Sequence, residues 1–143
     1  MSSGFRLVEE KRRARSVARR VRSGLINHNR SKVGAPRYRP LVLSARDVKG
    51  RLIGGLVGQL YWNALYVELL WVSTRARGEG VGRGLMQAAE GRARRARKDL
   101  IYLNTYTFQA PGFYRGLGFR SIGRIAGYPR GASRIFLVKR LKR

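Results

Sequence analysis

The sequence has 143 residues, 43% of them hydrophobic, which is enough for one domain with a buried core. Cysteine is absent, which excludes disulfide bonds, a thiolate nucleophile and a cysteine-ligated metal site. Thirty-two Lys and Arg residues, 26 of them Arg, stand against seven acidic residues, so the net charge is +25 at pH 7. This charge attracts polyanions such as nucleic acid and repels cationic substrates at long range. The alternatives to a polyanionic partner are that the Arg excess reflects genomic composition or an engineered surface, and both alternatives stay open.

The chain has no pattern typical of membrane insertion or secretion. Its apolar runs are far shorter than the roughly 20 residues of a membrane-spanning helix. The N-terminal segment MSSGFRLVEEKRR lacks the apolar stretch of a secretory signal. Together with the missing cysteines, these features favour a cytoplasmic protein.

The first half of the chain predicts a helix followed by three antiparallel strands. The helix has Arg on most faces and an apolar stripe formed by Ala14, Val17, Ala18, Val21, Leu25 and Ile26. The segment DVKG, residues 47–50, is typical of a hairpin turn. Residues 65–73 are apolar on both faces, which predicts a central strand. The predicted elements are a short strand (5–8), the helix (9–28), a loop (27–39) and the strands 40–46, 51–62 and 65–73.

The second half predicts a strand–helix–strand unit and then an antiparallel pair. A helix that connects two neighbouring strands implies a right-handed crossover and a roughly parallel pair. We therefore predict a single domain over residues 1–143, with an α/β fold, a mixed, mostly antiparallel sheet and helices on both faces. The helix spans 81–98, with inward residues Leu85, Ala88, Ala89, Ala93 and Ala96. The other elements are strands 100–107, 120–127 and 133–141 and a short helix within 109–119.

The segment RARGEGVGRGL, residues 75–85, lies between a predicted strand and a predicted helix. Its glycines alternate at Gly78, Gly80, Gly82 and Gly84. Alternating glycines indicate a backbone that a ligand approaches closely, and the N–H groups of a helix N-terminus suit a pyrophosphate. The pattern is neither a P-loop, which needs Lys-Ser/Thr after its last Gly, nor a Rossmann fingerprint. A glycine-rich connector without a ligand is the alternative.

Three motifs occur together along the chain: Arg77-x-x-Gly80-x-Gly82, the preceding strand ALYVELLWV, and QAPGFYRGLGF at 109–119. Together they resemble the GNAT N-acetyltransferases, and the resemblance covers residues 5–141. It implies the acyl-CoA N-acyltransferase fold, in which two central strands splay and leave a V-shaped gap. It also implies that an amine attacks acetyl-coenzyme A directly, without an acyl-enzyme, which agrees with the missing cysteines.

The resemblance further implies where acetyl-coenzyme A binds. The pantetheine arm pairs with backbone groups near Trp71, Val72 and Ser73, and a backbone N–H between Leu70 and Val72 polarises the acetyl carbonyl. The pyrophosphate lies on the loop and the first helical turn, formed by Arg77, Gly78, Glu79, Gly80, Val81, Gly82, Arg83 and Gly84. Many members carry an Asn contact to the coenzyme where this chain has Thr107, and Asn104 and Gln109 are alternative substitutes.

Glu68 is an acidic residue inside an otherwise apolar strand. Burial of a carboxylate is costly unless the group is paired or its pKa shifts, and a raised pKa suits a general base. In some family members a Glu four residues before the Val of this strand deprotonates the amine, and Glu68 stands four before Val72. The alternative is a structural ion pair between Glu68 and a buried Arg.

Tyr114 is the Tyr of the Phe-Tyr pair in the third motif. The resemblance implies that it protonates the departing thiolate of the coenzyme. A phenol with a pKa near 10 needs help from its surroundings for this step. The alternative is a tyrosine that only packs at the end of a helix.

We therefore predict an N-acetyltransferase that uses acetyl-coenzyme A, with Glu68 as general base and Tyr114 as general acid. The acceptor is a small-molecule or peptide amine, and His28, the only His, does not support a metal site. The rival is a nucleic-acid-binding protein on an inactive acetyltransferase scaffold, since an Arg-rich surface also binds nucleic acid non-specifically. A homodimer is common in the family. The aromatic residues are candidates for an acceptor pocket, with ordinary core packing as the alternative: Tyr61, Trp62, Tyr66, Tyr106, Phe108 and Tyr128.

Overall fold

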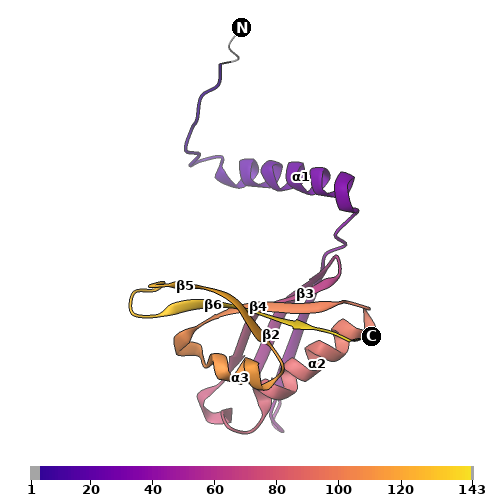
Figure 1. Ribbon diagram of the computed structural model, residues 1–143, viewed down its shortest axis with the longest axis vertical. Helices are drawn as coiled ribbons and strands as arrows, with labels where there is room; N and C mark the ends of the chain where they lie inside the picture. The colour runs from indigo at the N-terminus through magenta and orange to yellow at the C-terminus, as the bar shows by residue number, and fades with distance from the viewer. Residues whose placement is uncertain (1–3, 143) are drawn as a thin grey trace. The chain divides into compact units, whose positions relative to one another are not determined.

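The computed structural model describes residues 4–142 of the chain (Figure 1). Contacts divide the chain into two compact units, Met1–Pro36 and Arg37–Arg143. The first unit holds one helix, α1 (Ala14–Val33). It ends where Gly34 takes a φ of 88° and donates its N–H to the carbonyl of Arg30 at 3.0 Å. Among residues 4–142, no helix is long and apolar enough to cross a membrane.

Two predictions for the first unit are wrong. Residues 5–8 form neither helix nor strand, because a strand exists only where its backbone groups find a partner strand. α1 begins later than predicted, at Ala14, and continues to Val33 through the segment predicted as a loop. No Gly or Pro interrupts residues 25–33, so helical bonding continues until Gly34.

The second unit is built on a six-stranded sheet in the order β1-β2-β3-β4-β6-β5. β3 and β4 pair in parallel and the other neighbours are antiparallel, which confirms the predicted mixed, mostly antiparallel sheet. β3 lies inside the sheet, as its apolar sequence predicts. The strands are β1 (Arg39–Arg46), β2 (Leu52–Tyr61), β3 (Ala64–Val72), β4 (Leu100–Tyr106), β5 (Arg120–Ala126) and β6 (Ser133–Arg140).

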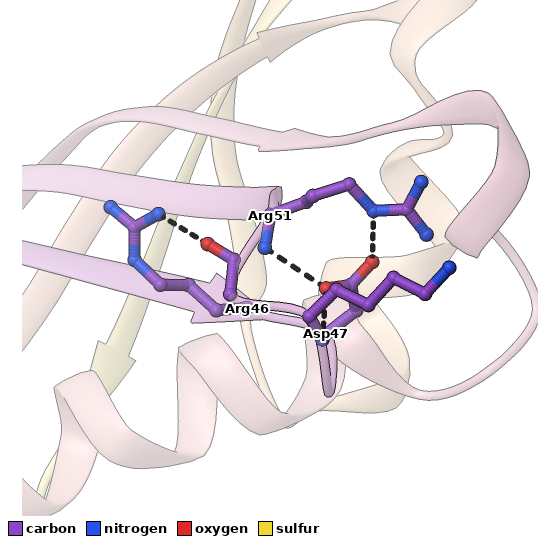
Figure 2. A network of polar contacts seen from close by, with 5 residues as sticks. Arg46, Asp47 and Arg51 are labelled. Carbon is purple, nitrogen blue, oxygen red and sulfur yellow. Dashed lines mark hydrogen bonds and ion pairs between the residues drawn. The ribbon is translucent and has the colours of Figure 1, made fainter.

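The turn between β1 and β2 is closed by the side chain of Asp47 (Figure 2). Its Oδ1 accepts hydrogen bonds from the backbone N–H groups of Lys49 and Arg51, both at 2.9 Å, and its Oδ2 accepts one from Arg51 Nε at 2.7 Å. Arg46 donates to the carbonyl of Gly50 at 2.9 Å. The backbone hydrogen bond from Arg51 is the main cause that lowers the pKa of Asp47. The predicted hairpin is confirmed.

A β-bulge interrupts the pairing of β2 with β3. On β3, Val67 and Leu69 face consecutive residues of β2, so Glu68 is the extra residue of the bulge. A bulge bends its strand and increases the local twist. The parallel pairing of β3 with β4 ends at the same point, with Val67 opposite Leu103. Beyond it the two central strands separate, which confirms the predicted V-shaped gap.

Two helices, α2 (Val81–Arg95) and α3 (Pro111–Gly116), lie on the same side of the sheet (Figure 1). Ala88 was expected to face inward but is exposed, whereas Met86 is buried. Successive helix residues are rotated by about 100°, which places Ala88 outside the buried stripe. The core between α2 and the sheet is formed by Leu85, Met86, Ala89, Ala93, Leu56, Leu65, Ile101, Leu103 and Leu137.

Two features fix α2 against the sheet. Gly54 on β2 lets the helix begin close to the strands, because a Cβ there would lie 2.9 Å from Val81 Cγ1 and 3.0 Å from the Trp71 carbonyl oxygen. Farther along the helix, Glu90 forms an ion pair with Lys139 of β6 at 2.6 Å. These contacts hold the N-terminus of α2 beside the end of β3, where the strands splay.

Candidate active site

A cleft with a volume of about 780 Å³ occupies the gap between β3 and β4. Its walls are the open ends of both strands, the loop and first turn of α2, and the segment from η2 (Thr107–Gln109) into α3. Segments far apart in the sequence therefore meet in one cavity. Lining residues with chemically distinct side chains are Glu68, Arg77, Asn104, Phe108 and Tyr114.

The N-terminus of α2 opens into the cleft without a capping side chain. The short helix η1 (Thr74–Ala76) leads from β3 to the loop, where Gly80 takes a φ of 82° directly before the first helical residue. The first turn holds no acidic residue, so its backbone N–H groups and the positive end of the helix dipole are available to an anion. Arg77 and Arg83 line the same part of the cleft and add positive charge. This arrangement suits a pyrophosphate.

Glu68 lines the cleft at the bulge of β3, but its side chain is exposed. The prediction of a buried carboxylate is wrong, because β3 leaves the cover of β4 directly after Val67. Leu69 and Trp71, farther along the same strand, are also exposed. Among residues 4–142, Glu68 forms no ion pair, so the alternative of a structural pair with a buried Arg is not found. Position in the cleft, rather than burial, makes Glu68 a candidate base.

Tyr114 of α3 is buried in the core and lines the cleft. Edge-to-face contacts hold its ring, with centroid distances of 5.1 Å to Phe113 and 6.1 Å to Phe119. Burial raises the pKa of the phenol above its ordinary value, so the hydroxyl stays protonated at neutral pH. A phenol held in this form can donate a proton and does not compete as a base.

The position of the family's Asn contact is occupied by Thr107, which turns away from the cleft lining. Its Oγ1 accepts a hydrogen bond from the backbone N–H of Ser133 at 3.1 Å, and the residue is not part of the cleft wall. Gln109 and Asn104 both line the cleft. Asn104 is further oriented by Arg134, which donates to its Oδ1 from two nitrogens at 2.9 and 2.6 Å. Of the three candidate substitutes, only Asn104 and Gln109 therefore reach the site.

The cleft includes most residues that the sequence assigned to the coenzyme: Leu70, Trp71, Val72, Arg77, Gly78, Gly80, Val81, Gly82 and Arg83. Ser73, Glu79 and Gly84 are not part of its wall. Sequence reasoning missed Thr105 and Phe113, which also line it. Thr105 could have been predicted, because it lies near the carboxyl end of a strand parallel to β3. The carboxyl ends of two parallel strands meet at the same edge of a sheet.

The chain is similar in sequence to known acetyltransferases. Residues 7–119 match the acetyltransferase (GNAT) family. The chain is 46% identical over 94 residues to a blasticidin-S acetyltransferase from Streptomyces morookaense, covering 65% of this chain and 69% of that protein. It is 32% identical over 120 residues to acetyltransferase Atu2258 from Agrobacterium fabrum, covering 84% of this chain and 88% of that protein.

The fold comparison agrees with the sequence comparison. A crystal structure of an acetyltransferase from Bacillus cereus matches the chain with a TM-score of 0.87 and 29% identity, over 95% of this chain and 98% of that one. The splayed strands, the uncapped helix N-terminus and the three sequence motifs therefore have one explanation. The chain belongs to the GNAT acetyltransferase family and is an N-acetyltransferase that depends on acetyl-coenzyme A.

Proposed function

We propose that an amine attacks the acetyl group of bound acetyl-coenzyme A directly, with Glu68 as the general base and Tyr114 as the general acid. One observation carries this proposal: a carboxylate, a protonated phenol and an uncapped helix N-terminus line the same cavity. An acyl transfer to an amine needs a group that accepts a proton, a group that donates one, and a site for the anionic coenzyme.

The pyrophosphate of the coenzyme binds, in this proposal, to the N–H groups of the loop and the first turn of α2. The pantetheine arm runs along the edge of β3 near Trp71, Val72 and Ser73. The end of β3–β4 pairing at Val67 supports this path, because backbone groups beyond it are left for a ligand to pair with. A backbone N–H between Leu70 and Val72 polarises the acetyl carbonyl.

During the reaction a bond forms between the amine nitrogen and the acetyl carbon, and the carbon–sulfur bond breaks. The nitrogen loses a proton to Glu68, and the exposure of this side chain supports transfer through a water molecule. The departing thiolate takes the proton of Tyr114. The raised pKa keeps this proton on the phenol before the reaction but also opposes its release, so the surroundings in the cleft must favour the transfer to the thiolate. The products are the N-acetylated amine and free coenzyme A.

The acceptor that we propose is blasticidin S or a related amine. The support is the 46% identity over 94 residues to the blasticidin-S acetyltransferase of Streptomyces morookaense. The net charge of +25 acts against polycationic acceptors, because they are repelled at long range. An amine of low positive charge carries a smaller penalty.

Calorimetry of acetyl-coenzyme A binding at two salt concentrations tests the proposed function, with ATP as a comparably anionic control. Affinity that exceeds that of ATP and persists at high salt supports a shaped coenzyme site. Affinity that disappears with salt together with that of ATP contradicts it. Coenzyme A release with blasticidin S and a panel of other amines then tests the acceptor.

A second candidate function, non-specific binding of nucleic acid, is favoured by cationic residues at the C-terminal end of α2. Burial and the charges of Arg39, Arg92 and Arg37 lower the pKa of Lys98. A shallow cavity of about 330 Å³ is lined by Arg94, Arg97, Lys98, Leu141 and Lys142. Like charges held this close attract a phosphate backbone. Binding of a single-stranded DNA oligonucleotide that weakens steeply with salt supports this function, and no binding at low salt contradicts it.

A further inference from the structure

Three aromatic rings form a nearly parallel stack that reaches the cleft at one end. Tyr106, at the end of β4, is the middle ring. Its centroid lies 5.2 Å from that of Phe108 with an interplanar angle of 10°, and 6.0 Å from that of Tyr128 with an angle of 13°. The two outer residues are open to solvent, with Phe108 64% and Tyr128 48% exposed. Phe108 also lines the cleft, so one end of the stack faces it.

The segment that carries Phe108 is held in place by hydrogen bonds of the residues directly before and after it. Gln109 Oε1 accepts hydrogen bonds from Thr105 Oγ1 and from the backbone N–H of Tyr106, both at 3.1 Å. Thr107 accepts one from the backbone N–H of Ser133 in β6. An exposed phenylalanine on a segment fixed in this way loses little further freedom when a ligand binds, and such preorganisation is typical of a recognition site.

Arg134 of β6 occupies the position at this stack where a cation would bind. Its guanidinium carbon lies 5.6 Å from the centroid of Tyr106 and 5.9 Å from that of Tyr128. Two of its nitrogens donate to Asn104, and among residues 4–142 it forms no ion pair with an acidic side chain. A second cation beside these rings is repelled by this charge. The stack is therefore suited to a flat, uncharged ring rather than to an ammonium group.

The stack lies on the face of the sheet opposite to α2. Side chains alternate between the two faces of a strand, and on β4 the buried Leu103 and Thr105 belong to the side that packs against α2. Asn104 and Tyr106 therefore project to the other side. The coenzyme site that we propose starts at the N-terminus of α2, so the stack is placed to meet the molecule that approaches the acetyl group from the opposite face.

We propose that the stack of Phe108, Tyr106 and Tyr128 recognises a flat, conjugated ring carried by the acceptor amine. The ring of the acceptor stacks on the free face of Phe108, and its amino group reaches the cleft beside Glu68. This inference rests on the proposed function, because it assigns the same cleft an acceptor class. It adds that the chain selects acceptors by ring planarity rather than by positive charge.

The experiment compares two amines of similar size, 2-phenylethylamine and 2-cyclohexylethylamine. Burial of apolar surface alone favours the saturated ring, which has more of it, so a preference for the phenyl amine reports stacking. Dissociation constants are measured by NMR titration of the full chain, with and without saturating coenzyme A. We expect the phenyl amine to bind about two- to tenfold more tightly than the cyclohexyl amine, the range that a stacked aromatic pair contributes.

Two variants of the stack and one control variant test whether the stack causes the preference for the phenyl amine. Phe108→Leu keeps an apolar side chain but removes the ring, and we expect it to abolish the preference while it retains the affinity for the cyclohexyl amine. Tyr128→Leu, at the other end of the stack, is expected to reduce the preference. Phe5→Leu removes an even more exposed phenylalanine that does not line the cleft, and it should leave the preference unchanged. Equal affinities in the wild type, or a preference that survives both stack variants, overturn the proposal.

The adenine of coenzyme A is the other flat ring that would meet this chain. If Phe108→Leu weakens binding of coenzyme A and leaves the phenyl preference intact, the stack serves the coenzyme and the acceptor role is overturned. Coenzyme A release from acetyl-coenzyme A with the amine panel is measured separately. If no amine is acetylated, the proposed function fails, whereas the ring comparison still decides this inference because it measures binding.

Discussion

Gly58 on β2 faces the backbone of Tyr66 on β3 so closely that a Cβ on Gly58 would lie 2.7 Å from the Tyr66 carbonyl oxygen. This contact belongs to the bulge that sets Glu68 at the start of the splay. A methyl group there cannot be accommodated by rotation of a side chain, because its neighbour is backbone. The bulge must shift, and the cleft with it.

We expect Gly58→Ala to lower the free energy of unfolding by about 1–3 kcal/mol, the usual cost of overpacking. Urea denaturation measures the change. Gly123→Ala is the matched control, because Gly123 also lies in a strand and a Cβ there meets nothing within 4 Å. Equal stabilities of the two variants would show that the close approach at Gly58 does not constrain the fold.

Replacement of Glu68 by Gln removes the proposed base and leaves the shape of the side chain. We expect kcat to fall by about 10²-fold or more, the typical contribution of a positioned general base. The dissociation constant of acetyl-coenzyme A should stay unchanged, because the proposed coenzyme contacts use other groups. Glu9→Gln, which alters an exposed acid outside the cleft wall, is the control for the loss of one negative charge. A kcat that matches the wild type would exclude Glu68 as the base.

The proposed role of Tyr114 as general acid predicts that kcat decreases at high pH, which gives the pH profile of kcat a high-pH limb. Burial raises its pKa above the ordinary value of 10.0, and the proposed role requires the protonated form. Activity that depends on this proton is therefore fully present below the ordinary value and is lost only as pH rises through the higher pKa of the folded protein. We expect Tyr114→Phe to lower kcat by about 10²-fold and to remove this limb. A high-pH limb that persists in the variant would assign it to another group.

Glu90 links α2 to β6 through Lys139 at 2.6 Å and also pairs with Arg94 at 3.2 Å. Burial alone would raise the pKa of Glu90, but the hydrogen bonds and charges of these two partners outweigh it and lower the pKa. The stabilisation is therefore present above the unfolded pKa near 4.5 and is lost as pH falls through the lower folded value.

We expect Glu90→Gln to cost about 1 kcal/mol of unfolding free energy at pH 7, and less as the pH is lowered below 4.5. Thermal melts across this pH range measure the difference from the wild type. Glu10→Gln is the control, because Glu10 pairs with Arg13 at the longer distance of 3.8 Å and the Arg13 side chain is 78% exposed, so this pair contributes little. A cost that does not change with pH would contradict a role for the Glu90 charge.

The parts of the fold that follow local rules were predictable from the sequence. Asp47 closes the hairpin through residues two and four positions away, and Gly80 precedes the helix as the alternating glycines indicate. The exposure of Glu68 was not predictable, because the bulge depends on how β3 pairs with two other strands. The contact of Thr107 with Ser133 was likewise hidden, since it joins segments that are distant in the sequence.

Gly82 provides the most direct test of the coenzyme loop. A Cβ there would lie 3.3 Å from Phe113 Cζ, which is tighter than most contacts of a Cβ atom, so the Phe113 ring or the first turn of α2 has to shift by a few tenths of an ångström. Since the proposed pyrophosphate contacts are backbone N–H groups of this turn, we expect Gly82→Ala to weaken acetyl-coenzyme A binding by about tenfold, the loss of one charge-assisted hydrogen bond.

The matched variant Gly84→Ala separates this steric effect from a change in helix propensity. A Cβ on Gly84 meets nothing within 4 Å, and Ala is favoured over Gly within a helix by about 1 kcal/mol. Calorimetry should therefore find a weaker affinity only in Gly82→Ala, while both variants retain the wild-type melting temperature or exceed it. Equal affinities in the two variants would mean that the pyrophosphate does not depend on the position of the first turn of α2.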